Sequence, residues 1–347
     1  MLVVLAGFGA GLLTLLPAVA GARRLGLVDL PTSRSSHVAR TPRVGGFALL
    51  GALAGGGAWW QAHEGHGVLP QGTVAFVVPA LGFFLLGLAD DRWRLGARGK
   101  ALAQAALAAL AVVLGWRFAG EPSAGFAALG FGVLDPFMAW LWIVAVVTVV
   151  NFLDGIDLIT CAVHVTPLAL AASAGAGLAG GALPAALLGG VLALALFNIT
   201  PARTFPGDAA THLLGFALAL LPMQLDGVPG LTPLPWAWAA APLLPAVIDI
   251  GLGLVAKRRK GLRWSAAHRE HLHQRLTRAG WTHVASALRY GALTSLAALF
   301  VVVIVPRFGW QVAAPTALAA LGLHLAHAAR RTRSVAWAAP PDVAQNG

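Results

Sequence analysis

Acidic and amide side chains gather at the ends of long apolar stretches in this sequence. Ionisable groups near a membrane-spanning segment are energetically costly and are usually retained for function. Carboxylates supplied by separate segments form a hard-oxygen environment, which favours Mg²⁺ or Mn²⁺ over zinc. We therefore expect one shared site from Asp29, Asp90, Asp91, Asn151, Asp154, Asp157 and Asp208.

A basic, histidine-rich segment near residue 270 supplies the complementary chemistry. If this segment is helical, His268, His271 and Arg275 share one face. Such a face binds phosphate oxygens through charge-assisted hydrogen bonds. The histidines make a poor zinc site, because no cysteine accompanies them. Carboxylates with a metal, opposed by His and Arg, indicate phosphoryl transfer at a membrane surface.

The composition identifies the kind of scaffold that must position these groups. Of the 347 residues, 58% are hydrophobic and 11% are charged, and the mean hydropathy is +0.76. A soluble domain carries roughly 25% charged residues, so a soluble enzyme and a disordered chain are excluded. The single Cys161 excludes a disulfide scaffold. The chain is predicted to be an all-α polytopic membrane protein.

About eleven apolar segments are long enough to be helices that span or enter a bilayer. A signal peptide is the other interpretation of the first segment, but no basic region precedes it. The predicted helices cover residues 2–22, 44–62, 72–89, 99–118, 134–150, 158–177, 181–198, 209–225, 234–255, 285–305 and 311–328.

Positive charge predicts the orientation of these helices. Of the 24 Lys and Arg residues, 20 fall in one alternating set of connections, whereas the other set holds only Arg307. Because Lys and Arg mark the cytoplasmic side, the N-terminus is predicted to be periplasmic and the C-terminus cytoplasmic. This clustering also argues against a nucleic-acid-binding face. We expect one integral-membrane domain over residues 1–337 and a disordered tail over 338–347.

Several polar residues inside apolar segments need their own interpretation. Asp249 either pairs with an arginine at the inner end of its helix or lines the cleft. His164 and His212 are expected to be buried and hydrogen-bonded, and Cys161 is expected to be a packing residue. Glycines such as Gly51 and Gly55 either allow close helix–helix contact in lipid or only reflect a composition rich in Ala and Gly.

Six motifs, in order over about residues 25–283, resemble the polyprenyl-phosphate N-acetylhexosamine-1-phosphate transferases. The segment from His268 to Trp281 is most similar to the O-antigen-initiating branch of this family. The motifs are Asp29-Leu30-Pro31-Thr32-Ser33-Arg34-Ser35-Ser36-His37, Thr41-Pro42-Arg43-Val44-Gly45-Gly46, Gly87-Leu88-Ala89-Asp90-Asp91, Asn151-Phe152-Leu153-Asp154-Gly155-Ile156-Asp157, Phe205-Pro206-Gly207-Asp208 and His271-Leu272-His273-Gln274-Arg275-Leu276.

The resemblance implies a reaction at the cytoplasmic face of a bacterial inner membrane. Polyprenyl phosphate, expected to be undecaprenyl phosphate, attacks the sugar-linked phosphate of a UDP-N-acetylhexosamine and releases UMP. The product would initiate O-antigen or other cell-envelope polysaccharide synthesis. The sugar is left open between N-acetylglucosamine and a 6-deoxy hexosamine, and the family implies a homodimer.

The resemblance also implies roles for individual residues. Asn151 and Asp208 are expected to hold Mg²⁺ or Mn²⁺. The catalytic residues implied are Asp90, Asp91 and Asp208, the first two at the entry of the lipid phosphate. The substrate-binding residues implied are Asp154, Asp157, His268, Arg269, His271, His273, Arg275, Arg34 and His37.

The chain departs from the family pattern at three places. Leu158 stands where the family usually has Gly, Pro206 stands where Met or Leu is common, and residues 209–212 replace a Ser-Gly-Ser-like run. Two other functions are possible for a chain of this kind. The segment from His268 to Trp281 and the short loops argue against peptidoglycan-type transfer of a phospho-muramoyl-peptide. A transporter or flippase would place its charges near the midplane, with internal repeats, whereas these charges lie at helix ends.

Overall fold

The computed structural model describes residues 1–31, 39–64, 72–118, 134–175, 181–225, 235–261, 270–300, 304–308 and 310–335. In these ranges the chain is almost entirely helical, with one small two-stranded ribbon. The elements are α1 (Leu2–Leu25), β1 (Val28–Asp29), β2 (Thr41–Pro42), α2 (Gly46–His63), α3 (Thr73–Trp93), α4 (Ala97–Val113), α5 (Asp135–Leu153), α6 (Ile159–Ser173), α7 (Ala182–Asn198), α8 (Gly207–Leu225), α9 (Pro235–Arg259), α10 (Leu272–Arg278), α11 (His283–Leu299), α12 (Val305–Phe308) and α13 (Trp310–Thr332).

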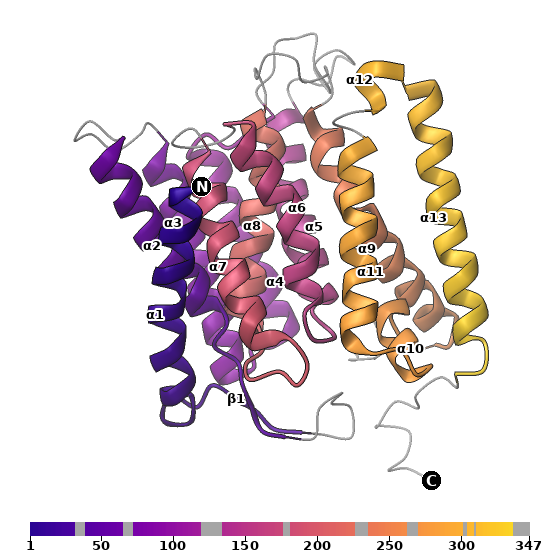
Figure 1. Ribbon diagram of the computed structural model, residues 1–347, viewed down its shortest axis with the longest axis horizontal. Helices are drawn as coiled ribbons and strands as arrows, with labels where there is room; N and C mark the ends of the chain where they lie inside the picture. The colour runs from indigo at the N-terminus through magenta and orange to yellow at the C-terminus, as the bar shows by residue number, and fades with distance from the viewer. Residues whose placement is uncertain are drawn as a thin grey trace.

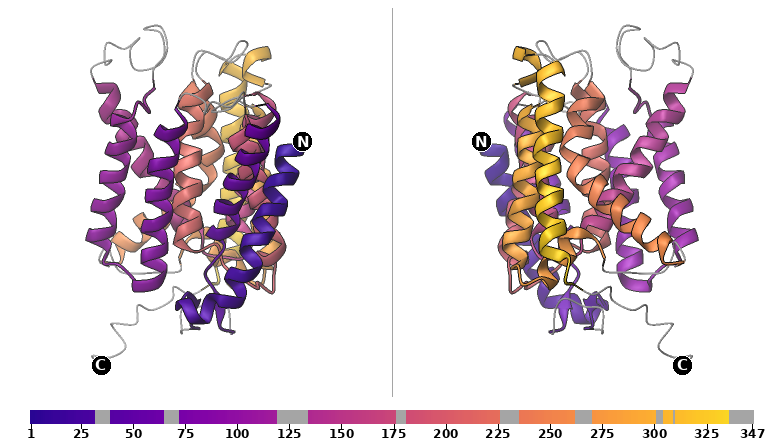
Figure 2. Two further views of the ribbon diagram at one scale, coloured as in Figure 1. Left: turned by 90° about the vertical axis from the view of Figure 1, so that its left-hand side faces the viewer. Right: turned by 90° about the vertical axis from the view of Figure 1, so that its right-hand side faces the viewer.

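Each of the eleven predicted apolar segments forms a helix. These helices run alternately up and down as a bundle (Figure 1), as the side views also show (Figure 2). Three of them are long and apolar enough to cross a bilayer: α1, α3 and α5. The chain is therefore a helical membrane protein, while the number and the orientation of its crossings stay predictions. The predicted tail at 338–347 lies outside the described residues.

Four small elements have no counterpart among the predicted apolar segments. β1 pairs antiparallel with β2, with Val28 opposite Pro42, and the short helices α10 and α12 flank α11. The ribbon lies at the end of the bundle where α1 finishes (Figure 1). Arg43, next to β2, pairs with Asp29 at 2.9 Å and forms a bridge to Phe205. The ribbon thus reaches the segment that leads into α8.

Small residues allow helices to pack closely at the N-terminal side of the bundle. A Cβ added at Gly51 would lie 2.1 Å from Thr14 Oγ1, and one added at Gly55 would lie 2.2 Å from Ala10 Cβ. Because real Cβ atoms do not approach so closely, α1 and α2 touch through glycine, which confirms the expectation for these two residues. The glycines at 176–180 lie outside the described residues.

Helix α8 occupies the middle of the bundle. Its side chains from Ala209 to Leu214 are buried on every side, and Phe216 stacks on Phe83 of α3 with ring centroids 5.0 Å apart. A helix that is apolar around its whole circumference belongs in such a core. Because α8 begins at Gly207, its central position places Asp208 in the middle of one end of the bundle.

Candidate active site

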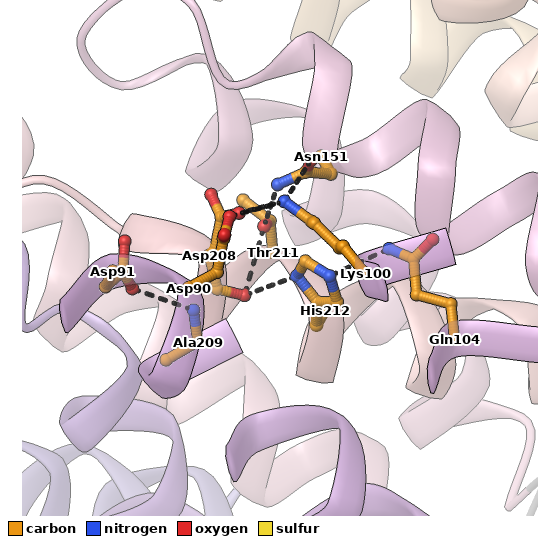
Figure 3. Close-up of polar contacts among 9 residues, drawn as sticks. All are labelled: Asp90, Asp91, Lys100, Gln104, Asn151, Asp208, Ala209, Thr211 and His212. Atoms are coloured by element: carbon orange, nitrogen blue, oxygen red, sulfur yellow. Dashed lines mark hydrogen bonds and ion pairs between the residues drawn. The ribbon is translucent and has the colours of Figure 1, made fainter. Parts of the chain in front are cut away.

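Lys100 joins three predicted site residues from three other helices (Figure 3). Its ammonium group donates to Asp90 Oδ2 at 2.8 Å, to Asn151 Oδ1 at 3.2 Å and to Asp208 Oδ2. Asp90, Lys100, Asn151 and Asp208 form the Lys100 cluster, and they come from α3, α4, α5 and α8 respectively. Lys100 was missed by the sequence analysis, although a lone lysine in the first turn of an apolar helix is a usable signal.

A glycine brings the carboxylates of α3 and α8 together. A Cβ added at Gly87 would lie 2.2 Å from the carbonyl oxygen of Asp208, so only glycine permits this approach. One turn later, Asp91 Oδ2 accepts a hydrogen bond from the amide of Ala209 at 3.1 Å. Asp91 therefore caps the N-terminus of α8, whose unpaired amides favour a carboxylate.

Asp90 and Asp91 face different partners because adjacent helical residues point about 100° apart. Asp90 faces the ammonium of Lys100, whereas Asp91 is buried against the start of α8. The Oδ1 atom of Asp91 has no hydrogen-bond partner among the described residues. The two carboxylates thus offer two distinct environments within one site.

A layer of polar contacts supports the site from inside the bundle. Asn151 Nδ2 donates to Thr211 Oγ1 at 3.0 Å. His212 Nδ1 donates to the carbonyl of Asp208 at 2.7 Å, and Gln104 Nε2 lies 2.8 Å from His212 Nε2. His212 is therefore a buried, hydrogen-bonded histidine, as predicted. The 209–212 run that departs from the family pattern supplies these supporting side chains.

The loop between α5 and α6, the acidic loop, carries Asp154 and Asp157. Thr160 donates to Asp154 Oδ1 at 2.7 Å, and Thr200 donates to Asp157 Oδ2 at 2.8 Å. Asp157 also lies 3.2 Å from His283 Nδ1. Burial raises the pKa of Asp154 to about 7, although the hydrogen bond from Thr160 acts in the opposite direction. The hydrogen-bond and ion-pair partners of the two acids are thus Thr160, Thr200 and His283, and not Lys100.

Leu158 ends this loop with a backbone conformation that favours glycine. Its φ is 69° and its ψ is −15°, in the left-handed region. A side chain there costs roughly 1–2 kcal/mol, which gives a physical reason for a glycine in the family pattern. The Leu158 side chain is buried and its amide donates to Asn198 Oδ1 at 2.7 Å.

Asp249 anchors the histidine-rich segment from within α9. The carboxylate accepts from His273 Nδ1 at 2.7 Å, from Tyr290 Oη at 2.6 Å and from the amides of Leu272 and His273. The expectation that Asp249 pairs with an arginine is wrong, because His273 and Tyr290 are its partners. It is almost fully buried, so it does not line an open cleft.

The prediction that His271 and Arg275 lie on one helical face is also wrong. Helix α10 begins at Leu272, and His271 precedes it with an extended backbone. Arg275 pairs with Glu270 at 2.8 Å and donates to the carbonyl of Thr332 at 2.9 Å, which ties α10 to α13.

His273 lies closest to the acidic loop among the described histidines of this segment. It is fully buried, and a Cβ added at Gly155 would lie 2.8 Å from its Nε2 atom. Its ring lies parallel to that of His271 with centroids 5.7 Å apart. Four further predicted substrate-binding residues lie outside the described residues: Arg34, His37, His268 and Arg269.

Cys161 fits its predicted packing role, and His164 fits its predicted role in part, because its Nε2 atom is buried without a hydrogen-bond partner among the described residues. Both are buried in α6, and His164 Nδ1 donates to the carbonyl of Thr160 at 2.6 Å. Among the described residues, neither side chain forms a hydrogen bond to the Lys100 cluster.

The Lys100 cluster has the donor chemistry that Mg²⁺ prefers. Two carboxylates and one amide oxygen converge on a single positive charge. Over the described ranges, no three His, Cys, Asp or Glu side chains stand close enough together to hold a metal by themselves. Mg²⁺ needs only one or two carboxylates when substrate phosphates complete its shell, so Asp90, Asn151 and Asp208 fit such an ion.

Comparison with known proteins places this cluster within a family. The sequence model described as glycosyl transferase family 4 matches residues 73–226, which include the whole Lys100 cluster. The chain is 30% identical over 293 residues to the decaprenyl-phosphate N-acetylglucosaminephosphotransferase of Mycobacterium tuberculosis, covering 76% of this chain and 72% of that protein. It is 28% identical over 288 residues to the enzyme of the same name from Mycolicibacterium smegmatis, covering 75% and 71%.

A more distant relative shows the same pattern. The chain is 25% identical over 283 residues to the undecaprenyl-phosphate alpha-N-acetylglucosaminyl 1-phosphate transferase of Escherichia coli K12, covering 75% of this chain and 72% of that protein. The resemblance in the six motifs, the family match and these relatives agree. The chain belongs to glycosyl transferase family 4, among the polyprenyl-phosphate N-acetylhexosamine-1-phosphate transferases.

Proposed function

We propose that this protein transfers N-acetylhexosamine 1-phosphate from a UDP-sugar to polyprenyl phosphate. A phosphate oxygen of the lipid attacks the sugar-linked phosphorus. The bond from that phosphorus to the bridging oxygen breaks, and UMP leaves with the bridging oxygen. The product is polyprenyl-pyrophosphoryl-N-acetylhexosamine. The observation that carries this proposal is the junction of Lys100 with Asp90, Asn151 and Asp208.

Lys100 is suited to neutralising charge on the phosphates. Phosphoryl transfer is accelerated mainly by positioning and charge stabilisation rather than by covalent chemistry. The ammonium group lies among three oxygen groups and is only 17% exposed, so its charge is poorly screened. The attacking phosphate oxygen is already anionic, so Asp90 serves to orient the acceptor and Lys100 rather than to remove a proton from it.

We assign Mg²⁺, or Mn²⁺, to Asp90, Asn151 and Asp208. When bound, the ion neutralises charge on the pyrophosphate oxygens of the donor. Lys100 then holds the same carboxylates in place from the α4 side. Asp91, which caps α8 through the amide of Ala209, fixes the direction of Asp208 within this set.

The acidic loop and the histidine-rich segment are assigned to the sugar nucleotide. Asp154 and Asp157 lie on one side, and His273 approaches the same loop at Gly155. The approach of His273 to Gly155 supports a donor site between α5, α6 and α10. His271 belongs to the same proposed subsite, whereas Arg275 acts through its contact with Glu270.

The proposed setting is the cytoplasmic face of a bacterial inner membrane. The Lys and Arg distribution supports this orientation. The names of the relatives support undecaprenyl or decaprenyl phosphate as the acceptor and N-acetylglucosamine as the first sugar to test. Initiation of O-antigen or other envelope polysaccharide synthesis and a homodimeric assembly are further parts of this proposal.

UMP release by purified protein in detergent tests the reaction. The assay contains undecaprenyl phosphate, a panel of UDP-N-acetylhexosamines and Mg²⁺. We expect release that requires both lipid and metal, stops with EDTA and is lost in Asp208→Asn. Asp135→Asn is the matched control, because Asp135 lies at the opposite end of α5 from Asn151. Folded protein that releases no UMP with any donor would overturn the proposal.

A further inference from the structure

A cavity lies between α11 and α13, two helices at one side of the bundle (Figure 1). Its volume is about 640 Å³, and both of its walls come from these two helices. On α13 the lining residues recur every three or four positions, as expected for one helical face. The cavity therefore lies between one face of α11 and one face of α13.

The end of the cavity nearest α10 is basic. It is lined by Arg289 of α11 and by His324, His327 and Arg330 of α13. Arg289 Nε donates to His324 Nδ1 at 2.8 Å. Because an arginine only donates, His324 accepts here and does not neutralise the guanidinium charge. The Nε2 atom of His327 is buried without a hydrogen-bond partner among the described residues.

Arg289 lies in an apolar helix without an acidic partner. No carboxylate of the described residues forms an ion pair with it, and the face of Trp281 lies 5.3 Å from its guanidinium carbon. Glu270, the acid before α10, is buried and paired with Arg275 and Arg278. Arginine in a membrane segment is costly unless it is paired or reaches the interface, so this position favours an anionic partner.

The remainder of the cavity is apolar. Leu293 and Leu296 of α11 face Ala320 and Leu323 of α13. Leu323 is 73% exposed and Leu296 is 38% exposed, as expected for apolar side chains that face lipid. The cavity thus has a basic end and an apolar length, which is the shape and polarity of a lipid with a charged headgroup.

We propose that an anionic glycerophospholipid of the surrounding bilayer binds in this cavity. Its phosphate contacts Arg289, His327 and Arg330, and one acyl chain lies along the leucines of α11 and α13. Charge complementarity selects this occupant, because the described lining contains the guanidinium groups of Arg289 and Arg330, two histidines that offer hydrogen bonds, and no acid. The proposal does not depend on the transferase reaction, since none of these residues contacts the Lys100 cluster.

Lipid retention by purified protein tests the proposal. The protein is exchanged into nanodiscs of equal phosphatidylglycerol and phosphatidylcholine, extracted with mild detergent and weighed by native mass spectrometry. Wild type should retain phosphatidylglycerol over phosphatidylcholine. Arg330→Gln and Arg289→Gln should each reduce that retention at least about fivefold. A gel-filtration profile checks folding, and Arg330 is exposed, so its variant should fold normally.

Arg331→Gln is the matched control, because Arg331 is an exposed neighbour that does not line the cavity. It should retain phosphatidylglycerol like the wild type. Equal retention of both lipids, or equal losses in the Arg330 and Arg331 variants, would overturn the proposal. So would a lipid-free dimer, or retention of polyprenyl phosphate in place of phosphatidylglycerol. UMP release, measured in parallel, should be unchanged in Arg330→Gln.

Discussion

The Nδ1 atom of His273 donates to Asp249 Oδ2 across 2.7 Å, which links a buried carboxylate of α9 to a histidine of α10. Because a carboxylate only accepts, the contact fixes which ring nitrogen carries the proton and directs Nε2 toward the acidic loop. The same carboxylate accepts the first amides of α10. One acid inside the membrane helix therefore orients the whole short helix.

We expect Asp249→Asn to destabilise the protein and to weaken donor binding. The amide cannot accept every hydrogen bond of the carboxylate, and an unsatisfied buried donor costs about 1–3 kcal/mol. Thermal unfolding should occur at lower temperature, and the KM for the UDP-sugar should rise. Tyr290→Phe removes only one of the four donors and should have a smaller effect. Unchanged KM in a destabilised Asp249→Asn variant would limit His273 to a structural role.

Lys100→Met should abolish most of the activity with little change in fold. The substitution keeps the length of the side chain but leaves the Asp90 and Asp208 carboxylates without their shared cation. Loss of one such electrostatic group lowers kcat roughly 100- to 1,000-fold. Arg98→Gln, an exposed basic residue two positions earlier in α4, is the control and should retain normal UMP release. Comparable kcat values in the two variants would argue against a role for Lys100.

At position 158 the glycine variant should be more stable than the alanine variant, which is the reverse of the order in a helix. Replacing a buried leucine by alanine costs roughly 2–5 kcal/mol, but the left-handed backbone at φ 69° penalises alanine and not glycine. We therefore expect Leu158→Gly to unfold at higher temperature than Leu158→Ala, by about 1 kcal/mol of stability.

Leu153 provides the comparison for this measurement. It is buried and lies in the last turn of α5, where the backbone is helical. At such a position glycine is less stable than alanine by about 1 kcal/mol. The same order at Leu158 as at Leu153 would mean that the left-handed conformation is not populated in the protein.

The stability contribution of Asp154 should depend on pH between about 4 and 8. Burial raises the pKa of this carboxyl to about 7, from an ordinary value near 3.8. The folded state therefore binds the proton more tightly than the unfolded state, and stability falls as pH rises from 4 through 7. As pH rises over this range, the wild type should lose thermal stability, so the unfolding temperature of Asp154→Asn should rise relative to that of the wild type.

Thr160→Val provides a directional check on this interpretation. The Thr160 hydroxyl donates to Asp154 Oδ1 and holds the pKa of Asp154 below the value that burial alone would give. Its removal should shift the loss of stability to higher pH. An unfolding temperature of Asp154→Asn that parallels the wild type at every pH would contradict the raised pKa.

Hydropathy is a property of consecutive residues, and for that reason the sequence alone predicted eleven helices. It also predicted that Asp90, Asn151 and Asp208 lie at the same end of the bundle, because each follows or begins an apolar segment. The family motifs are local as well, so the reaction class was predictable before any contact was known. Orientation in the membrane remains an inference from charge.

Contacts between distant segments were decided only by the tertiary structure. The partners of Lys100 lie on three other helices, and the residues next to Lys100 in the sequence do not indicate which ones. Likewise, Asp249 acquires His273 as its partner because α9 and α10 pack together, and Arg275 is drawn to Glu270 and the end of α13. Such pairings depend on how helices are arranged in space, which hydropathy and spacing along one segment do not specify.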